Sequence, residues 1–279
     1  MSEYNYQHLL ESVLDIGEER EDRTGVGTVE TFGESLHFHV GHSFPLLTTK
    51  KMHFRGIAEE LLWFIQGGTL DIDTWEWRMG KKELQEKGIH IWDEWDAPNP
   101  KFEGDLGPIY GAQLRHYGPD EIDQLSNLIH GLKTDPYSRR HVITMWNPTD
   151  IPEMALPPCH GLVIQFYVSN DGKLDLIMHQ RSADLFLGLP YNIASYALLL
   201  RMVAQVTGYE ARWLDINIGC AHIYKNHISQ VNELLERSPK GFPQLKIDPS
   251  IKNIDDFTFE SFELVGYYPH PAIKAPVAV

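Results

Sequence analysis

The sequence predicts an α+β protein in which one large mixed or antiparallel sheet is packed by long helices. Three strand-like runs, 141–146, 162–168 and 173–179, follow one another in the middle of the chain. An apolar run over 191–206 is typical of a buried helix that covers such a sheet. No repeat, low-complexity segment or linker divides residues 1–279, so we expect a single domain.

The first half of the chain alternates helix and strand signals. Apolar side chains at helical spacing predict a first helix with Ser2 as its N-cap, followed by a charged loop over 18–28. Alternation over 36–40 predicts a half-buried strand, and the apolar periodicity of 57–64 predicts a second helix. Residues 69–108 are rich in Trp, Gly, Pro and Asp, so we expect less regular structure there.

The second half adds the three strand-like runs and more helices. A helix is expected over 120–133, before those runs. After the buried helix, a strand is expected over 213–218 and a helix over 222–236. The tail from residue 241 is punctuated by proline, which predicts extended or irregular structure.

Composition restricts the partners and the compartment. The formal charge is 24 − 39 = −15, which repels nucleic acid and anionic membranes, so an anionic substrate requires a local arginine cluster. The chain has two cysteines, its first 16 residues do not resemble a secretory signal, and its longest apolar run is too short and polar to span a bilayer. We therefore expect a cytoplasmic protein with free thiols and no membrane partner.

Cys159 is the first candidate for chemistry. It lies in the segment ALPPCH (155–160), between two strand-like runs. A reactive thiol requires positive neighbours, and arginines occur in SRR (138–140) and QRSAD (180–184). The alternative interpretation is a buried, inert thiol. The adjacent His160 does not make a hydrolase dyad, because consecutive residues of an extended chain point in opposite directions.

Several other residues have types suited to binding an anionic heterocycle. Arginine forks and a serine hydroxyl at 139, 140, 181 and 182 suit phosphate, although a surface ion-pair cluster gives the same pattern. Trp92 and Trp95 offer flat faces for stacking or, alternatively, core packing. Glu60 lies in an apolar helix, where burial would raise its pKa and allow proton transfer. We expect no metal site, because the histidines at 37, 39 and 42 lack accompanying cysteines or carboxylates at metal-ligand spacing.

Taken together, the motifs of this chain resemble the thymidylate synthase family over nearly its full length. The matching segments occur in family order. They are DRTGVG (22–27), FPLLTTK (44–50), ELLWF (60–64), IWDEW (91–95), GPIYG (107–111), SRR (138–140), MALPPCH (154–160), QRSADLFLGLPYNIASY (180–196), HIY (222–224) and YPHPAIKAPVAV (268–279).

The resemblance implies a methyltransferase that makes dTMP and dihydrofolate from dUMP and 5,10-methylenetetrahydrofolate. In that scheme the Cys159 thiolate adds to C6 of uracil and activates C5, which is covalent catalysis. C5 then receives a methylene group, and hydride from the folate reduces it to methyl. The folate is therefore a cosubstrate that provides both carbon and reductant.

The resemblance also implies a role for each matching residue. The expected catalytic residues are Cys159, Glu60, Tyr110, His160, Asn192 and Arg181, with Arg181 lowering the pKa of the thiol. The expected nucleotide-binding residues are Arg23, Arg139, Arg140, Arg181, Ser182, Ala183, Asp184, Asn192, His222 and Tyr224. The expected folate-binding residues are His53, Ile91, Trp92, Trp95, Asp184, Leu187, Gly188, Tyr191 and Ala278, with Lys50 and Lys51 toward the glutamate tail and 277–279 closing over the ligands.

The resemblance further implies a homodimer that forms through one face of the sheet. Arg139 and Arg140 are expected to reach the phosphate site of the partner chain, so that each active site requires two chains. Asn192 is expected to read uracil, since its amide carries both a donor and an acceptor.

The chain departs from the family pattern at a few positions, and two alternatives stay open. Cys220 stands where the family usually has Asp, Tyr191 where Phe is usual, and 69–90 is longer than in compact members. One alternative is a dUMP 5-hydroxymethylase, in which water captures the exocyclic methylene and tetrahydrofolate is released. The other is a non-catalytic binding homologue, against which Cys159, Arg181, Asn192 and Glu60 argue.

Overall fold

Six strands form the main sheet of the computed structural model, which describes residues 3–278. Their order across the sheet is β1-β2-β8-β7-β6-β5. β7 and β8 run parallel and the other neighbouring pairs run antiparallel, so the sheet is mixed. The strands are β1 (Glu18–Arg20), β2 (Thr28–His39), β5 (Val142–Ile143), β6 (Val163–Val168), β7 (Lys173–Asp184) and β8 (Glu210–Tyr224).

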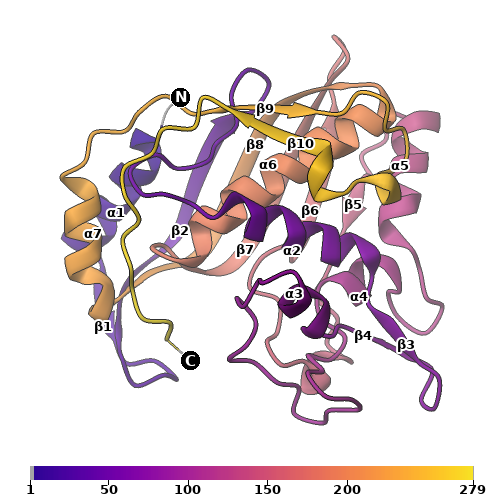
Figure 1. Ribbon diagram of the computed structural model, residues 1–279, viewed down its shortest axis with the longest axis horizontal. Coiled ribbons are helices and arrows are strands. Elements are labelled where there is room, and N and C mark those ends of the chain that lie inside the picture. Colours follow the sequence, from indigo (N-terminus) through magenta and orange to yellow (C-terminus); the bar gives the residue numbers. More distant parts are fainter. Residues whose placement is uncertain (1–2, 279) are drawn as a thin grey trace.

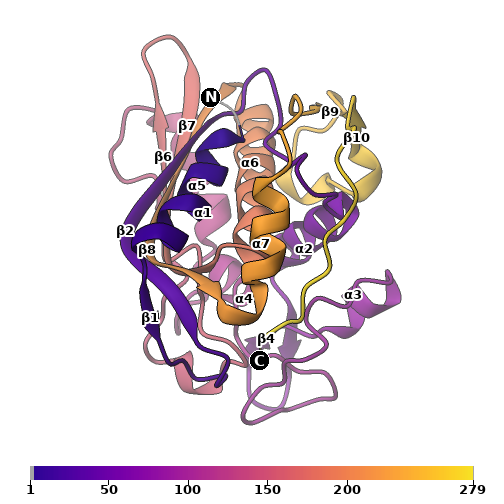
Figure 2. The same cartoon turned by 90° about the vertical axis from the view of Figure 1, so that its left-hand side faces the viewer.

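Helices cover one face of this sheet, as Figures 1 and 2 show. α6 packs against β7 and β8, and 15 of its 20 residues are buried, which makes it the central helix of the core. α6 ends where Gly208 adopts a φ of 84°, a conformation that glycine accepts without strain. The longer helices are α1 (Tyr4–Ile16), α2 (Phe54–Gln66), α5 (Gln124–Thr134), α6 (Gly188–Thr207) and α7 (Ile228–Leu235).

Shorter elements surround this core. Residues 69–115 hold one small hairpin and two short helices between longer irregular stretches, and a two-stranded antiparallel sheet lies near the carboxyl end. These elements are β3 (Thr69–Asp71), β4 (Glu76–Arg78), α3 (Lys82–Glu86), α4 (Gly111–Arg115), β9 (Gln244–Ile247) and β10 (Phe262–Val265).

The other face of the sheet carries no helix in the part of the chain that the structure describes (Figure 2). Along β6, buried residues alternate with accessible ones, and the accessible set includes Val163 and Tyr167. Val142 of β5 is also exposed. A sheet face with several exposed apolar side chains is a candidate contact surface.

The predicted α+β class and the large mixed sheet are confirmed. Helix α1 begins at Tyr4, with Glu3 at the N-cap position, whereas the predicted cap Ser2 lies outside the described residues. Glu3 does not cap the helix with its side chain, since its carboxylate accepts hydrogen bonds from Thr48 and Thr49. The buried helix and the second helix were predicted at nearly their observed positions.

The prediction of a helix over 222–236 was wrong for residues 222–227. β8 continues through Tyr224, and α7 begins only at Ile228 after a turn of 3₁₀ helix, Lys225–His227. The physical reason is pairing on both sides: His222 aligns with Glu30 of β2 and with Asp184 of β7. Two ladders of backbone hydrogen bonds outweigh a local preference for helix. The expected strand at 141–146 is, by contrast, only two residues long.

At Gly219, β8 passes close to the backbone of Arg181 of β7. A Cβ atom added at Gly219 would lie 2.8 Å from the carbonyl oxygen of Arg181, which is backbone and cannot turn aside. We predict that Gly219→Ala lowers the free energy of unfolding by about 1–3 kcal/mol, because the two strands must separate. Gly241→Ala is the control, since nothing lies within 4 Å of a Cβ there. Equal stability of both variants in urea denaturation would contradict this prediction.

Candidate active site

Groups from distant parts of the chain meet at the carboxyl ends of β7 and β8. The segment that carries Cys159 lies beside β7, where the backbone N–H of Arg181 donates to the carbonyl of Cys159 at 2.9 Å. On the other side of Cys159, its own backbone N–H donates to the hydroxyl of Tyr110 at 2.9 Å. Tyr110 is buried and has a φ of 21°, which is rare for a residue with a side chain. The main chain of the nucleophile candidate is thus held from two directions.

The guanidinium of Arg181 turns back over the Cys159 segment. Its Nε donates to the carbonyl of Pro158 at 2.9 Å and its Nη2 to that of Pro157 at 3.0 Å, and Nη2 lies 3.6 Å from the Cys159 sulfur. Burial raises the pKa of the Cys159 thiol, while the positive charges of Arg181 and Arg23 lower it. The net direction is upward. Arg181 therefore acts in the predicted direction, but burial outweighs it.

His160 cannot act as a base for the neighbouring thiol near neutral pH. Burial lowers the pKa of its ring to about 3, so the imidazole is neutral. Nδ1 of His160 lies 2.9 Å from the hydroxyl of Tyr196, and the ring stacks on Tyr110 with centroids 4.6 Å apart. Phe64 also stacks on Tyr110, with centroids 4.8 Å apart, and its ring centroid lies 6.5 Å from that of His160. His160 is thus part of an aromatic wall.

Glu60 carries a carboxyl group that exchanges its proton near neutral pH. Desolvation raises its pKa to about 7, and a 2.8 Å hydrogen bond from the indole N–H of Trp92 offsets only part of that effect. Its charge also raises the pKa values of Tyr110, Tyr191 and Tyr196, which places Glu60 among the groups near Cys159. The predicted rise in the Glu60 pKa is confirmed.

Asn192, in the first turns of α6, has its amide orientation fixed by Gln180. The Nε2 of Gln180 donates to Oδ1 of Asn192 at 3.0 Å and to the carbonyl of Ser182 at 3.1 Å. Asn192 is buried, and its amide N–H groups and a second lone pair of Oδ1 stay available for a ligand. Gln180 had no predicted role, although it stands in the same polar motif.

Asp184 orders the turn between β7 and α6. Its Oδ1 accepts hydrogen bonds from the backbone N–H groups of Phe186 and Leu187, at 2.9 and 3.1 Å. Burial opposes ionisation of this carboxyl, but the nearby His227 and the backbone bond from Leu187 lower its pKa, so it is an anion. The carboxylate of Asp184 therefore fixes the turn that leads into α6.

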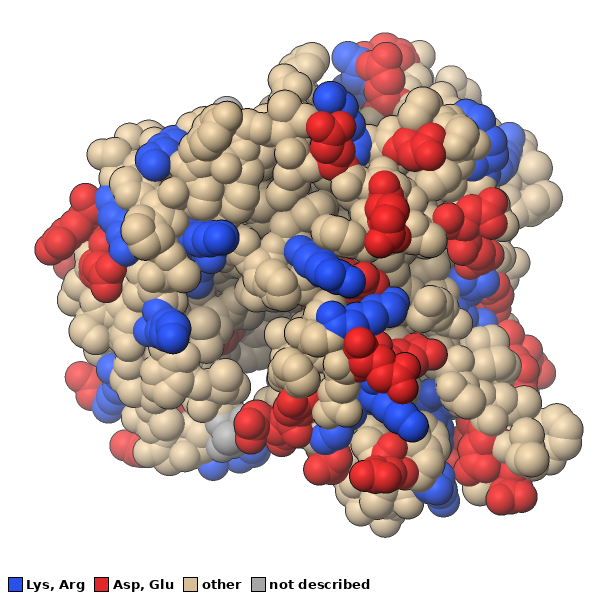
Figure 3. All heavy atoms as spheres, viewed as in Figure 1, with Lys and Arg blue, Asp and Glu red and all other residues tan. Residues whose placement is uncertain are grey.

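The C-terminal segment is tied to this site through His227, a residue without a predicted role. Its Nε2 donates to the carbonyl of Pro276 at 2.7 Å, and its Nδ1 lies 3.8 Å from Asp184. The predicted closing segment 277–279 follows directly, with Val279 outside the described residues. Figure 3 shows a hollow in this face of the molecule between the C-terminal segment and the segment around α3.

The structure brings most of the other predicted site residues to the same region. Arg23 is exposed and lies over the ring of Trp95, 5.7 Å from its centroid, and its charge affects both Cys159 and Tyr224. His222 and Tyr224 meet edge to face at the end of β8. Leu187 forms the N-terminal boundary of α6, and the helix begins with Gly188 and includes Tyr191.

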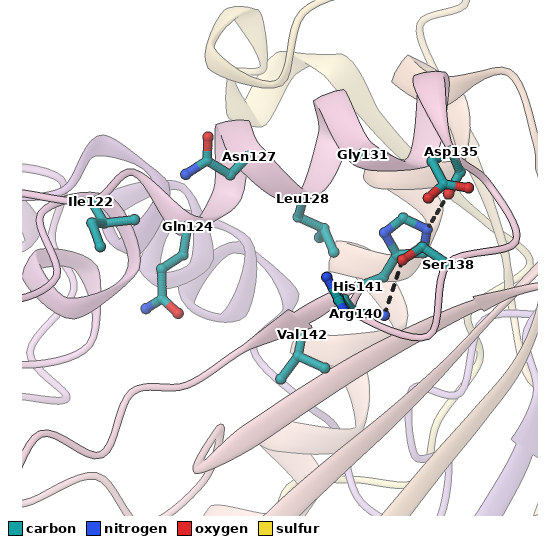
Figure 4. A pocket seen from close by; sticks show the side chains of 10 residues that line it. All are labelled: Ile122, Gln124, Asn127, Leu128, Gly131, Asp135, Ser138, Arg140, His141 and Val142. Atoms are coloured by element: carbon teal, nitrogen blue, oxygen red, sulfur yellow. Dashed lines mark hydrogen bonds between the residues drawn. The ribbon is translucent and has the colours of Figure 1, made fainter.

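Arg139 and Arg140 are exposed and do not reach Cys159 of their own chain. Neither forms an ion pair within residues 3–278. Arg140 lines a shallow pocket of about 310 Å³ between α5 and the edge of the sheet, together with Val142 and His141 (Figure 4). Because they have no ion-pair partner among the described residues, these two arginines at the edge of an uncovered sheet face are available to an anion outside the chain.

A few predicted residues lie at the periphery. His53 and Ile91 are exposed, whereas Lys50 is buried and donates to the carbonyl of Phe186. Ala183 is buried within β7, beside the half-buried Ser182. The described residues contain no group of three or more potential ligands arranged for a metal ion. Within the same residues, no helix is both long and apolar enough to cross a membrane.

Comparison with known protein families gives one result that covers nearly the whole chain. A family model described as thymidylate synthase matches residues 4–279. The match includes all the elements of the sheet and of the site described above.

The raised pKa of Glu60 predicts a stability effect that depends on pH. Below the ordinary value of 4.5 the carboxyl is protonated in both folded and unfolded chains; between 4.5 and about 7 only the folded chain keeps the proton. Stability is thus lost as pH rises through this window. Glu60→Gln removes the ionisable group. The change in the free energy of unfolding that it causes should therefore be more favourable at pH 8 than at pH 4.5, by at most about 3 kcal/mol.

Urea denaturation of wild type and Glu60→Gln at the two pH values measures this difference. The exposed Glu86→Gln, on α3, is the control and should show no such pH dependence. If Glu60→Gln changes the free energy of unfolding equally at both pH values, the pKa of Glu60 is not raised in the folded protein.

Proposed function

The chain belongs to the thymidylate synthase family, and we propose that it makes dTMP and dihydrofolate from dUMP and 5,10-methylenetetrahydrofolate. The family is one of one-carbon transferases that act on a pyrimidine nucleotide with a folate cosubstrate. The observation that carries the proposal is a thiol 3.6 Å from an arginine, in the same site as a carboxyl with a pKa of about 7.

The nucleotide is proposed to bind along the ends of β7 and β8. Arg23, Arg181 and Ser182 hold the phosphate, since guanidinium forks and a hydroxyl donate to its oxygens. Asn192 reads the uracil edge with the amide that Gln180 orients. His222 and Tyr224, together at the end of β8, hold the deoxyribose hydroxyl. Ala183 and Asp184 complete the wall between phosphate and base.

The chemical step begins with the Cys159 sulfur. Its electron pair forms a bond to C6 of uracil, the C5–C6 double bond opens, and the charge moves through C5 to O4. Glu60 supplies or accepts a proton near O4 through ordered water, for which a pKa of about 7 is suited. Arg181 stabilises the thiolate before attack, and Tyr110 and His160 fix the segment from which the sulfur attacks.

The folate is proposed to bind between the tryptophans, the start of α6 and the C-terminal segment. The bound folate supplies the one-carbon group and the hydride. Asp184 fits this ligand because it is an anion with lone pairs left for the N–H groups of a pterin. Trp92, Trp95 and Tyr191 offer apolar faces, Leu187 and Gly188 leave room beside them, and His53 and Ile91 extend the site outward. Ala278 covers it and excludes water.

We also propose a homodimer that forms through the sheet face without helices. The exposed side chains of Val142, Val163 and Tyr167 support such a contact. Arg139 and Arg140, exposed and unpaired at the edge of the same sheet, then reach the phosphate of the nucleotide bound by the other chain.

The product identifies the reaction. We expect the protein, given dUMP and methylenetetrahydrofolate, to form dihydrofolate and a nucleotide with the mass of dTMP in equal amounts, measured by absorbance and mass spectrometry. A hydroxymethyl product with tetrahydrofolate would establish the hydroxymethylase instead, and binding without turnover would establish a non-catalytic homologue. Cys159→Ser should reduce turnover at least about 10³-fold, because the nucleophile is lost.

Shared arginines predict complementation between inactive chains. Cys159→Ser chains and chains with Arg139→Glu and Arg140→Glu are each expected to be inactive alone. Mixed dimers contain one complete site, so an equal mixture should recover up to about a quarter of wild-type activity after subunit exchange. Heterodimers verified by native mass spectrometry that stay inactive would contradict the shared site.

A further inference from the structure

Cys220 lies between a carboxylate and an imidazole. Its sulfur is 3.4 Å from Oε2 of Glu30 on β2 and 3.8 Å from Nδ1 of His222, two residues along β8. Glu30 and His222 are paired across the two strands, so all three side chains belong to one row at the carboxyl end of β8. No catalytic or binding role proposed above uses the thiol or Glu30.

The thiol has one proton, and Glu30 is the better acceptor for it. Glu30 forms an ion pair with Arg20 at 3.1 Å and accepts a hydrogen bond from the hydroxyl of Thr28 at 3.1 Å, so its carboxylate is fixed in place. Burial and the Glu30 charge raise the pKa of Cys220 to about 12, so the thiol stays protonated at neutral pH. With its proton given to Glu30, the sulfur has only lone pairs to offer His222.

His222 is neutral and therefore has one N–H group to place. Burial lowers the pKa of its ring. Nδ1 faces the sulfur of Cys220 at 3.8 Å. Because the proton of the thiol is directed to Glu30, the sulfur can only accept a hydrogen bond from the ring. The sulfur therefore favours the tautomer with the proton on Nδ1.

We propose that Cys220, held by Glu30, is a positioning residue that keeps His222 in the Nδ1–H tautomer, so that Nε2 is an acceptor for the sugar hydroxyl of the nucleotide. The part that concerns the sugar rests on the proposed function. The sugar must then carry a hydroxyl that donates a hydrogen bond to Nε2 of His222. A nucleotide without this hydroxyl lacks that hydrogen bond and the affinity it contributes. The family usually has Asp at this position. In this chain the thiol of Cys220 stands there, and it is oriented by the carboxylate of Glu30 on the neighbouring strand.

The tautomer can be read directly, without any nucleotide. In the ¹H–¹⁵N spectrum of the imidazole rings, His222 of the wild-type protein should show a protonated Nδ1 and an unprotonated Nε2. In Glu30→Gln the thiol proton is free to turn to His222, so the Nε2–H form should appear. Glu34→Gln, further along β2, is the matched control, because its side chain forms no hydrogen bond or ion pair within residues 3–278. An Nε2–H form in the wild-type protein overturns the proposal.

Kinetics with two nucleotides separate positioning from a loss of structure. Cys220→Ala should raise the KM for dUMP about 5- to 10-fold with little change in kcat, because one hydrogen bond weakens. The dissociation constant of 2′,3′-dideoxyuridine monophosphate, which lacks the hydroxyl, should not change. Cys220→Ser should restore the wild-type KM, since a hydroxyl also donates and accepts.

Two further outcomes are informative. If Cys220→Ala weakens the binding of both nucleotides equally, the variant merely disturbs the site, and the proposal is overturned. A wild-type protein that does not bind dUMP overturns the proposed function and the sugar contact with it, whereas the ligand-free spectrum then still decides the tautomer.

Discussion

β7 and β8 lie parallel in the middle of the sheet, and the crossover that this arrangement requires is α6. Parallel strands put their carboxyl ends at the same edge, and the helix that leaves β7 begins at that edge too. Arg181, Asp184, Asn192 and His222 therefore meet although they span some forty positions of the chain. The apolar surface of α6 makes this arrangement stable, since it buries the helix between the sheet and α2 and α5.

Burial then determines the protonation states of the site. The same loss of water raises the pKa values of Cys159 and Glu60 and lowers that of His160. Arg181 and Arg23 are the local positive charges in a chain with a net charge of −15. The long-range field of the protein opposes an anionic ligand, so binding has to depend on these few short-range contacts.

The sequence predicted those features that depend on local patterns, such as helices with a buried face and site residues within motifs. Apolar periodicity located α1, α2 and α6 because each buries one face or its whole surface. It failed at His222–Tyr224, whose strand conformation depends on partners far away in the chain. Motifs identified Cys159, Arg181 and Glu60, but the net rise in the Cys159 pKa follows from burial, which local sequence does not encode. The supporting roles of Gln180, Tyr196 and His227 come from long-range hydrogen bonds.

The surroundings of Cys159 favour addition to an unsaturated carbon over acyl hydrolysis. A cysteine hydrolase requires a base beside the thiol, and here the adjacent imidazole has a pKa of about 3 and is engaged with Tyr196. The charges favouring the thiolate are those of Arg181, whose Nη2 lies 3.6 Å from the sulfur, and of Arg23. Addition to C6 of a uracil moves charge to a distant oxygen, where a carboxyl such as Glu60 can meet it. Addition of a thiol to C6 requires no base beside the thiol, but it does require a proton donor near the distant oxygen that receives the charge. Cys159 and Glu60 match these two requirements.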